Sequence, residues 1–343
     1  MTTPLQDGFR FPAEWEPHVA TWLTYPHSDD SFPGQLQNVY RPYMRFISEI
    51  VKSEKVRINV PELFKERFAC QLDKANIDAN QVEIFERESD DVWCRDHGPA
   101  FVVQNTPVKQ KAVVAWEFNA WGNKFPHNAD KLIASAVADD SGLHVYRPGI
   151  IMEGGAVELN GVGTVITTKA CLLNKNRNPH LNQQQIEKYL CDYLGVQQVL
   201  WLEDGIEGDD TDGHIDDITR FVNTHTVITT VESNKNDANY APLKKNLRIL
   251  QTVRLLDGRQ PCIAELPMPA PVFHNYQRLP ASYANFYITN DAVIVPTFRC
   301  KQDDVAMQII SECFPHHRIT DIDSTDIVKG GGSFHCLSQQ EPR

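Results

Sequence analysis

The chain has 343 residues, 41% hydrophobic and 23% charged, which predicts a globular protein with a sizeable core. Its net charge of −12 argues against nucleic acid as a partner, because phosphate binding needs clustered Lys and Arg, and suits a small cationic substrate. No apolar run approaches the roughly 20 residues of a membrane span, and residues 1–7 lack the features of a secretory signal, so we expect a cytoplasmic protein with no membrane partner. Its eight scattered cysteines predict neither a disulfide framework nor a zinc knuckle.

Strand-pair patterns recur five times along the chain. Each begins at a segment that contains Gly or Asp. Three of them indicate hairpins, because Asn-Gly or a similar pair separates two β-rich runs. The three turns are at Asn160–Gly161, Asn223–Thr224 and Asn290–Asp291. The five units begin with residues 95–117, 153–168, 213–231, 283–298 and 330–337.

Helix patterns accompany these strand pairs, and a short strand-like run follows each helix. The clearest helix begins at Pro179 and ends before Gly195, since Pro is common at helix starts and Gly just past helix ends. The predicted helices span 39–51, 128–141, 179–194, 243–256 and 303–313, and the strands that follow span 82–85, 143–146, 196–202, 262–266 and 317–319. This repeat predicts an α/β fold with strands around a central axis and helices outside, the alternative being an ordinary mixed α/β domain.

Two segments at the starts of these units carry carboxylates beside aromatic or glycine residues. In residues 89–99, Asp96 could hold a cation and Trp93 could offer its ring face to an alkyl chain or ammonium. The alternative is a structural ion pair between Arg95 and Asp96, with Trp93 in the core. Glu153 precedes two glycines that allow close backbone approach, and its alternative is a turn glutamate.

A third segment, 208–217, is rich in acidic residues around one histidine. If a strand opens at Gly213, Asp212, His214 and Asp216 share one face. Such a face could ligate a metal ion, although no second His or His-Glu-x-x-His motif accompanies it. It could equally place His214 for acid–base catalysis, with Asp216 gripping a cationic substrate. The remaining alternative is an acidic loop around a structural histidine.

The fourth segment presents a cysteine directly after a glycine run. Gly330 to Gly332 indicate a sharp bend or a close approach to a ligand, and a thiol held there has the exposure that a nucleophile needs. The alternative is a buried structural cysteine. Because neighbours on a strand point to opposite faces, we expect His214 rather than His335 to be the acid–base partner of Cys336, with His335 supporting or buried.

Five segments together resemble the signature motifs of the agmatine deiminases and the Porphyromonas-type peptidylarginine deiminases. In chain order they are 91–99, 153–155, 210–216, 281–287 and 330–336, and the resemblance extends from Trp15 to the C-terminal tail. It implies one pentein domain over residues 1–343, an α/β-propeller of five ββαβ units around a pseudo-fivefold axis. It also implies an enzyme without a metal or organic cofactor, from a family in which homodimers occur.

The resemblance assigns catalytic roles to five residues. It implies that Cys336 attacks a guanidinium carbon and that His214 protonates the departing ammonia and then activates water. Asp96 and Asp216 are expected to hold the guanidinium nitrogens, and Glu153 to orient His214. The chemistry is coherent, because two carboxylates can fix a planar cation while a soft thiolate attacks its carbon.

The expected substrate is agmatine, which would give N-carbamoylputrescine in putrescine and polyamine biosynthesis. Trp93 is expected to line the channel, and Asp210 and Asp212 are available for the distal ammonium. Ser333-Phe334 stands where many relatives have Asn-Ile, which leaves arginine or peptidylarginine as an alternative substrate. From other classes, a metal-dependent hydrolase and a non-catalytic polyamine-binding protein are the alternatives.

Overall fold

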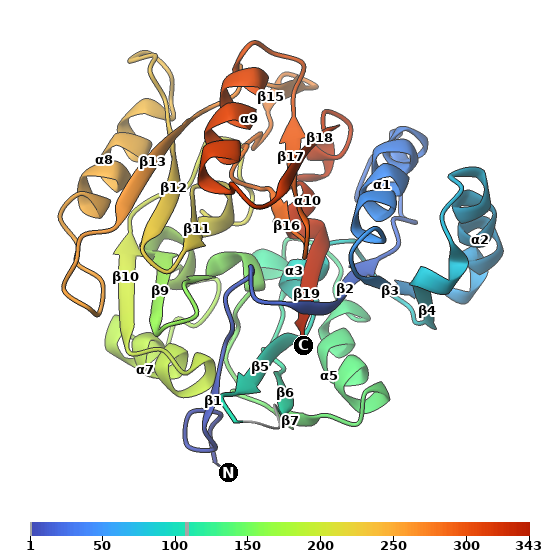
Figure 1. Ribbon diagram of the computed structural model, residues 1–343, viewed down its shortest axis with the longest axis horizontal. Helices are drawn as coiled ribbons and strands as arrows, with labels where there is room; N and C mark the ends of the chain where they lie inside the picture. Colours follow the sequence, from blue (N-terminus) through green and yellow to red (C-terminus); the bar gives the residue numbers. More distant parts are fainter. Residues whose placement is uncertain (1, 107–109) are drawn as a thin grey trace.

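A strand–strand–helix–strand unit repeats through the chain in the computed structural model, which describes residues 2–106 and 110–343. The first two strands of a unit are antiparallel, and the third lies parallel to the second after a helical crossover. Residue 1, and residues 107–109 inside the first predicted unit, lie outside the described part. Within that part there are five such units. Figure 1 shows them around a common centre with the long helices outside, which confirms the expected pentein architecture.

The first three units follow one another in chain order. Unit one contains β5 (Ala100–Gln104), β6 (Lys111–Val114), α5 (Asp130–Asp140) and β7 (His144–Tyr146), with β1 (Phe9–Arg10) at its edge. Unit two contains β8 (Glu158–Leu159), β9 (Thr164–Thr168), α7 (Gln183–Leu194) and β10 (Gln198–Leu202). Unit three contains β11 (Thr219–Asn223), β12 (Thr226–Val231), α8 (Tyr240–Leu250) and β13 (Cys262–Pro267).

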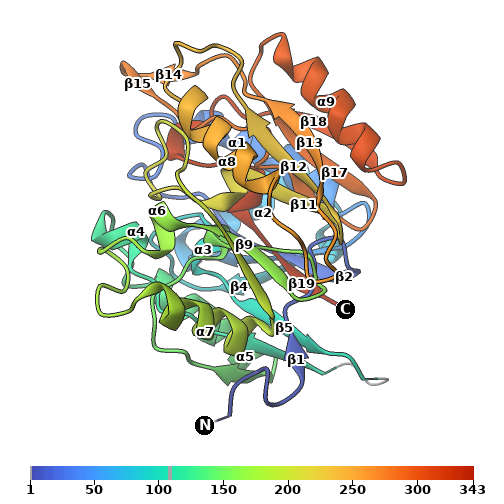
Figure 2. The same cartoon turned by 90° about the vertical axis from the view of Figure 1, so that its left-hand side faces the viewer.

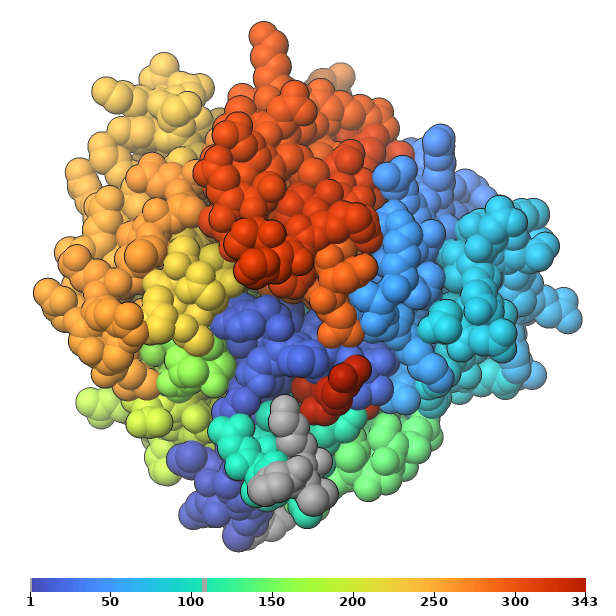
Figure 3. All heavy atoms as spheres, viewed as in Figure 1, coloured from blue at the N-terminus to red at the C-terminus, as the bar shows by residue number. Residues whose placement is uncertain are grey.

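The last unit is built from both ends of the chain. Unit four contains β16 (Tyr287–Ile288), β17 (Ala292–Thr297), α9 (Gln302–Cys313) and β18 (Arg318–Asp323). Unit five contains β19 (Ser338–Pro342), β2 (His18–Thr24), α1 (Leu36–Ile50) and β3 (Lys55–Val60), extended by α2 (Lys65–Lys74) and β4 (Val82–Glu86). Because β19 pairs with β2, the C-terminal and N-terminal segments meet near the centre of the face seen in Figure 3.

Short helices and turns occupy the loops between these strands. The α-helical ones are α3 (Cys94–His97), α4 (Ala120–Asn123), α6 (Lys169–Leu172) and α10 (Phe334–Leu337), and a small hairpin pairs β14 (Phe273–His274) with β15 (Gln277–Arg278). The 3-10 turns are Glu62–Phe64, Ala79–Gln81, Gly154–Ala156, Ile215–Asp217 and Val328–Gly330. Figure 2 shows α4 and α6 on one side of the strands, opposite the C-terminus.

The long helices form where local signals and apolar periodicity agree. The Asn182 side chain accepts the Gln185 N–H while the Gln185 side chain bonds back to Asn182, so α7 begins after the predicted start at 179. Gly195 ends the helix with a left-handed φ of 65°. The buried residues Ile186, Leu190 and Leu194 of α7 pack into the core of unit two. Among the described helices, none is long and apolar enough to cross a membrane.

Two expectations about unit five are wrong. Residues 334–337 form a helical turn, closed by the Leu337 N–H to the Ser333 carbonyl at 3.0 Å, and the strand begins only at Ser338. The strand β3 and helix α2, which lie between the predicted helix and the strand over 82–85, were not predicted. The first error arises where the strand partner is distant in the sequence, because β19 pairs with β2 and no local pattern encodes that pairing.

A buried ion-pair cluster joins several units near the centre. The Arg220 guanidinium donates to Glu14 at 2.5 Å, to Glu158 at 2.8 Å and to the carbonyl of Phe286 at 2.8 Å. Arg220 is fully buried, and its carboxylate partners are almost so. Breaking such a pair leaves uncompensated charge and costs about 3–5 kcal/mol. The cluster therefore fixes the N-terminal segment beside the loops that open units two, three and four.

Candidate active site

The candidate catalytic residues lie on loops that precede the first strands of units one, two, three and five. Asp96 is on α3 before β5, and Glu153 precedes β8. His214 and Asp216 lie at the 3-10 turn before β11, and Cys336 is on α10 before β19. Because these strands begin at the same end of the central axis, the loops converge there, as the repeat predicts.

Gly155 marks the point where these side chains meet. A Cβ at this position would lie 2.6 Å from His214 Nδ1, 2.9 Å from Asp96 Oδ1 and 3.1 Å from Asp216 Oδ2. The sulfur of Cys336 lies 3.5 Å from the same oxygen of Asp216. The four groups thus surround one small space, which a side chain at Gly155 would fill.

The glycine run before Cys336 has a steric cause. Gly331 has a φ of 103°, which favours glycine. A Cβ at Gly332 would lie 2.8 Å from the Trp93 ring and 3.0 Å from the Cys336 sulfur. The run therefore lets backbone pass between Trp93 and the thiol. The Cys336 side chain is buried, but it contributes to the wall of a cavity.

Asn285 organises the cysteine loop, a role that the sequence did not reveal. Its Oδ1 accepts the backbone N–H groups of Ser333, His335 and Cys336 at 3.2, 3.1 and 3.2 Å. Its Nδ2 donates to the Cys336 sulfur at 3.0 Å and to Asp217 Oδ1 at 3.0 Å. Although Asn285 lies inside one of the five motifs, sequence alone does not show which atoms an amide contacts.

Burial and nearby carboxylates keep Cys336 and His214 uncharged in the free site. Burial raises the pKa of Cys336 well above its usual value, and Asp216, Asp217 and Asp96 raise it further. Burial also lowers the pKa of His214 to about 3. The pKa of Asp96 is raised well above its usual value by burial, then by Asp216. The free site therefore holds a thiol and a neutral imidazole, and a bound cation would favour the thiolate.

The His335 ring lies between the carboxylates of Asp216 and Glu14. Its Nδ1 lies 2.7 Å from Asp216 Oδ2 and its Nε2 lies 2.9 Å from Glu14 Oε2. Ionised carboxylates can only accept, so both ring nitrogens carry protons and the buried ring is an imidazolium. Burial alone would raise the pKa of Asp216, but the hydrogen bond and charge of His335 outweigh it and lower that pKa. Since residue 335 lies in a helical turn, the strand argument that set it aside does not apply.

Replacing His335 by Gln should shift the pH dependence of turnover. His335 lowers the pKa of Asp216, so stabilisation of the Asp216 anion is present at neutral pH and lost as pH falls. Without the imidazolium the pKa of Asp216 rises, and the acidic limb of kcat/KM should move to higher pH. At neutral pH kcat/KM should fall about 10- to 100-fold, the effect of losing one charged hydrogen bond.

The control for this change is His18→Gln, which removes a buried His that bonds Glu54 instead of Asp216. It should leave the acidic limb in place. An unshifted limb in His335→Gln would show that His335 serves only the packing of the core.

Asp212 does not join the catalytic group, so the prediction of a shared strand face is wrong. Its backbone φ is 69°, and the residues after His214 form a 3-10 turn rather than a strand. Its carboxylate accepts from Arg177 at 2.6 Å and from Lys124 at 2.9 Å. The metal-binding alternative built on Asp212, His214 and Asp216 is therefore not assembled.

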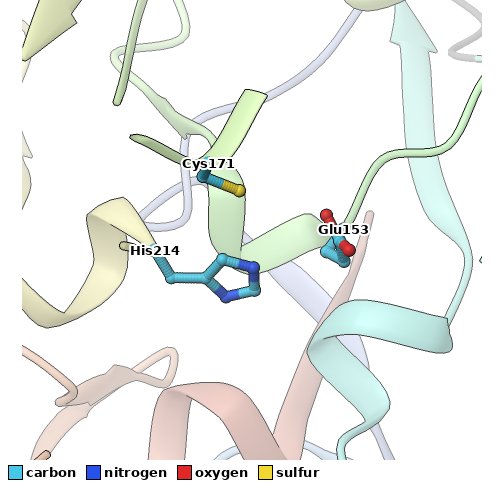
Figure 4. A group of neighbouring side chains, drawn as sticks. All are labelled: Glu153, Cys171 and His214. Carbon is cyan, nitrogen blue, oxygen red and sulfur yellow. The ribbon is translucent and has the colours of Figure 1, made fainter. Parts of the chain in front are cut away.

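Glu153 lies beside His214 but is held from its other side by Arg177. Its Oε1 accepts from Arg177 Nε at 2.6 Å, and both side chains are fully buried. Its Oε2 and both ring nitrogens of His214 have no hydrogen-bond partner among the residues that the structure describes. Figure 4 shows that Glu153 and His214 point toward one another, and orientation of His214 by Glu153 stays a prediction.

A narrow cavity leads from Cys336 toward the surface, where the exposed Asp30 is among its lining residues. Trp93, Trp121 and Phe125 contribute apolar walls, and Asp91 and Asp210 contribute carboxylates. Burial raises the pKa of both carboxyls to about 6. Trp93 and Asp210 thus both line this cavity, and their contacts with a substrate stay predictions.

The contacts of Trp121 and Arg95 show how Asp96 is held. Trp121 Nε1 donates to Asp96 Oδ2 at 3.0 Å, a contact that sequence reasoning missed because Trp121 lies outside the motifs. Arg95 instead donates to Gln340 Oε1 at 2.7 Å and to the His335 carbonyl at 3.3 Å. The alternative of a structural Arg95–Asp96 pair is thus wrong, and Asp96 faces the space next to Cys336.

Comparison with known proteins places this site in a family. A relative from Legionella pneumophila (strain Paris) is 38% identical, covering 100% of this chain and 98% of its own. The agmatine deiminase of Ectopseudomonas mendocina (strain ymp) is 34% identical, covering 99% and 97%. The structure of the Enterococcus faecalis agmatine deiminase superposes with a TM-score of 0.94 at 31% identity, covering 100% and 98%. A variant of the C. jejuni agmatine deiminase with substrate bound gives a TM-score of 0.88 at 31% identity, covering 98% and 96%. With residues 10–342 matching its model, the chain belongs to the Porphyromonas-type peptidyl-arginine deiminase family.

Proposed function

We propose that this protein is an agmatine deiminase, which converts agmatine and water to N-carbamoylputrescine and ammonia. The observation that carries the proposal is the convergence of Cys336, His214, Asp96 and Asp216 around the space next to Gly155. Two curated or solved relatives along nearly the full chain bear the same activity in their names. The cavity beyond Cys336 combines aromatic walls with carboxylates, which suits a cation at each end of an alkyl chain.

The first half of the reaction forms a covalent intermediate. Asp96 and Asp216 bind the guanidinium nitrogens, and the added positive charge lowers the pKa of Cys336. The thiol proton passes to neutral His214 as the sulfur bonds to the guanidinium carbon. The tetrahedral adduct then collapses: the carbon–nitrogen bond breaks, and His214 returns its proton to the leaving nitrogen, which departs as ammonia. Cys336 is left bonded to a cationic amidine.

The second half hydrolyses this intermediate. His214 is neutral again, so it accepts a proton from water as the water oxygen bonds to the amidine carbon. The second tetrahedral adduct breaks its carbon–sulfur bond and loses its hydroxyl proton to solvent, which releases the neutral ureido product and the thiolate. His214 then returns the proton to the sulfur. Because these residues supply nucleophile, acid and base, we propose that the reaction needs neither a metal nor an organic cofactor.

The charge of the cavity favours agmatine over arginine. Both substrates carry a guanidinium, but agmatine ends in an ammonium whereas arginine also carries a carboxylate. Asp91 and Asp210 line the cavity, and no Lys or Arg is among the described residues that line it. An arginine carboxylate would meet like charge there, while the agmatine ammonium would meet opposite charge. We also propose that the enzyme acts in the cytoplasm in putrescine synthesis, as a homodimer.

Replacing Asp210 by Asn should weaken the selection for a cationic tail. We expect kcat/KM for agmatine to fall about tenfold or more, because one charged contact to the ammonium is lost. Butylguanidine has the same alkyl length without the ammonium, so its kcat/KM should change little. The measurement is ureido product formed from agmatine, butylguanidine and arginine by wild type and variant.

Asp29→Asn is the matched control, because Asp29 is exposed and lies outside the cavity lining. It should leave all three substrates unaffected. Equal losses for agmatine and butylguanidine in Asp210→Asn would remove Asp210 from the ammonium contact. Preference of the wild type for arginine or a peptidylarginine would overturn the substrate assignment itself.

A further inference from the structure

Three different metal-ligand groups converge on the inner side of His214. The ligand atoms of Glu153, Cys171 and His214 all lie within 4.8 Å of one another, and the three side chains are buried. They come from separate segments: the loop before β8, helix α6 and the loop before β11. Figure 4 shows the three side chains facing a common point.

The polar atoms at this point are left without protein partners. Arg177 holds Glu153 Oε1, but Glu153 Oε2 and both ring nitrogens of His214 lack a hydrogen-bond partner within residues 2–106 and 110–343. His214 Nδ1 lies 3.8 Å from Asp96 Oδ1, on the substrate side. The other ring nitrogen faces Glu153 and Cys171 in Figure 4. Fully buried atoms of this kind call for a ligand, and the proposed reaction gives Cys171 no role.

We propose that Glu153, Cys171 and His214 form an inhibitory site for a thiophilic divalent cation such as Zn²⁺. Carboxylate oxygen, thiolate sulfur and imidazole nitrogen are the three ligand types that zinc prefers, at about 2.0–2.3 Å. Ligands at such distances around one tetrahedral ion lie roughly 3–4 Å apart, so a small rotation of the side chains would close the site. Mg²⁺ and Ca²⁺ prefer all-oxygen sites and should bind poorly.

Binding balances charge and protons within this group. The ion forms a bond to the Cys171 sulfur, and the thiol proton is released to solvent. One carboxylate and one thiolate then offset the two positive charges, and a water molecule can complete four ligands. Glu153 contributes Oε2 while Arg177 keeps its bond to Oε1.

Inhibition follows from which ring nitrogen the ion occupies, and this part rests on the proposed role of His214. A metal on the inner nitrogen leaves Nδ1 as an N–H, because the two nitrogens of a neutral ring carry one proton between them. Nδ1 then can no longer accept a proton from Cys336 or from water. Zinc should therefore stop both halves of the reaction without occupying the substrate cavity, and removal of the metal should restore activity.

The test separates metal binding from catalysis. Cobalt added to Cys336→Ala protein should give the charge-transfer absorption of a cobalt–thiolate bond, and this band should be absent from Cys336→Ala/Cys171→Ala protein. Since Cys336 is removed from both proteins, the band reports Cys171 whether or not the enzyme uses agmatine. A band of equal strength in the two proteins, or no band in the first, would overturn the proposal.

Zinc inhibition of agmatine turnover supplies the second arm. With Cys336 intact, Cys171→Ala should need at least about tenfold more zinc than wild type for half-inhibition, because one of three protein ligands is lost. Cys191→Ala, at a partly buried cysteine on α7, is the control and should keep the wild-type sensitivity. If Cys171→Ala unfolds, Cys171→Ser provides the same comparison. Unchanged zinc sensitivity in a folded Cys171 variant would overturn inhibition through this site. A cobalt band without any agmatine turnover would instead refute the proposed function.

Discussion

Replacing Cys336 by Ala should lower agmatine turnover at least about 10⁴-fold, because the variant lacks the thiol that forms the covalent intermediate. Asp96 and Asp216 remain, so the variant should still bind agmatine. The measurements are ureido product formation and agmatine binding by calorimetry, each with wild type and variant.

Cys94→Ala is the matched control for this change. Cys94 is also fully buried and lies two residues before Asp96, but its side chain belongs to the core between α3 and α5 rather than to the cavity lining. It should retain substantial turnover. Near wild-type turnover by Cys336→Ala would end the covalent mechanism.

Replacing Asp216 by Asn should lower turnover of agmatine but make Cys336 of the free enzyme more reactive. The variant loses a carboxylate that grips the guanidinium, so kcat/KM for agmatine should fall about 10²- to 10³-fold. In the free enzyme, however, Asp216 is the largest charge contribution that raises the pKa of Cys336. Its removal should lower that pKa and speed alkylation of the free enzyme by iodoacetamide at neutral pH.

Asp217→Asn is the informative comparison, because Asp217 raises the same pKa but bonds Asn285 instead of facing the space next to Gly155. Burial, and then Asp216, raise the pKa of Asp217 well above its usual value, so the exchange removes less negative charge and should speed alkylation less than Asp216→Asn does, with a smaller loss of turnover. Slower alkylation in Asp216→Asn would contradict the electrostatic account. Unchanged turnover would remove Asp216 from substrate binding.

Local sequence patterns predicted much of the repeated unit. The hairpin at Asn160–Gly161 was predicted because its turn residues and β-rich flanks agree, and α7 because capping and apolar periodicity agree. The pairing of β19 with β2 joins residues more than 300 positions apart, and no local pattern encodes it. The position of Cys336 at the common centre therefore depended on counting repeats and on the family resemblance.

The site was predicted less evenly than the fold. Asp96, Glu153, His214, Asp216 and Cys336 lie together, but Asp212 turns to Arg177 because a positive φ and a 3-10 turn replace the expected strand. Three contributors were not predicted to act at the site: Asn285, Trp121 and Asp91. Their contributions depend on contacts between separate loops, which residue type and spacing do not specify.

The role of His335 was also not predictable from residue type and spacing. The sequence places His335 next to the nucleophile, and alternation along a strand would turn it away. The helical turn of α10 instead directs it to Asp216 and Glu14, whose charges require both of its protons. A neighbour in sequence thus acts through a carboxylate that lies 119 positions away.

The most direct test of the central claim is mass analysis of enzyme quenched with acid during turnover of agmatine. The account predicts a transient mass increase equal to agmatine minus ammonia, because the alkyl chain stays on the amidine, located on the peptide that contains Cys336. The adduct should form as ammonia is released and disappear as N-carbamoylputrescine appears. His214→Ala should slow its formation and its hydrolysis. Product formation with no adduct, or an adduct on a residue other than Cys336, would contradict the account.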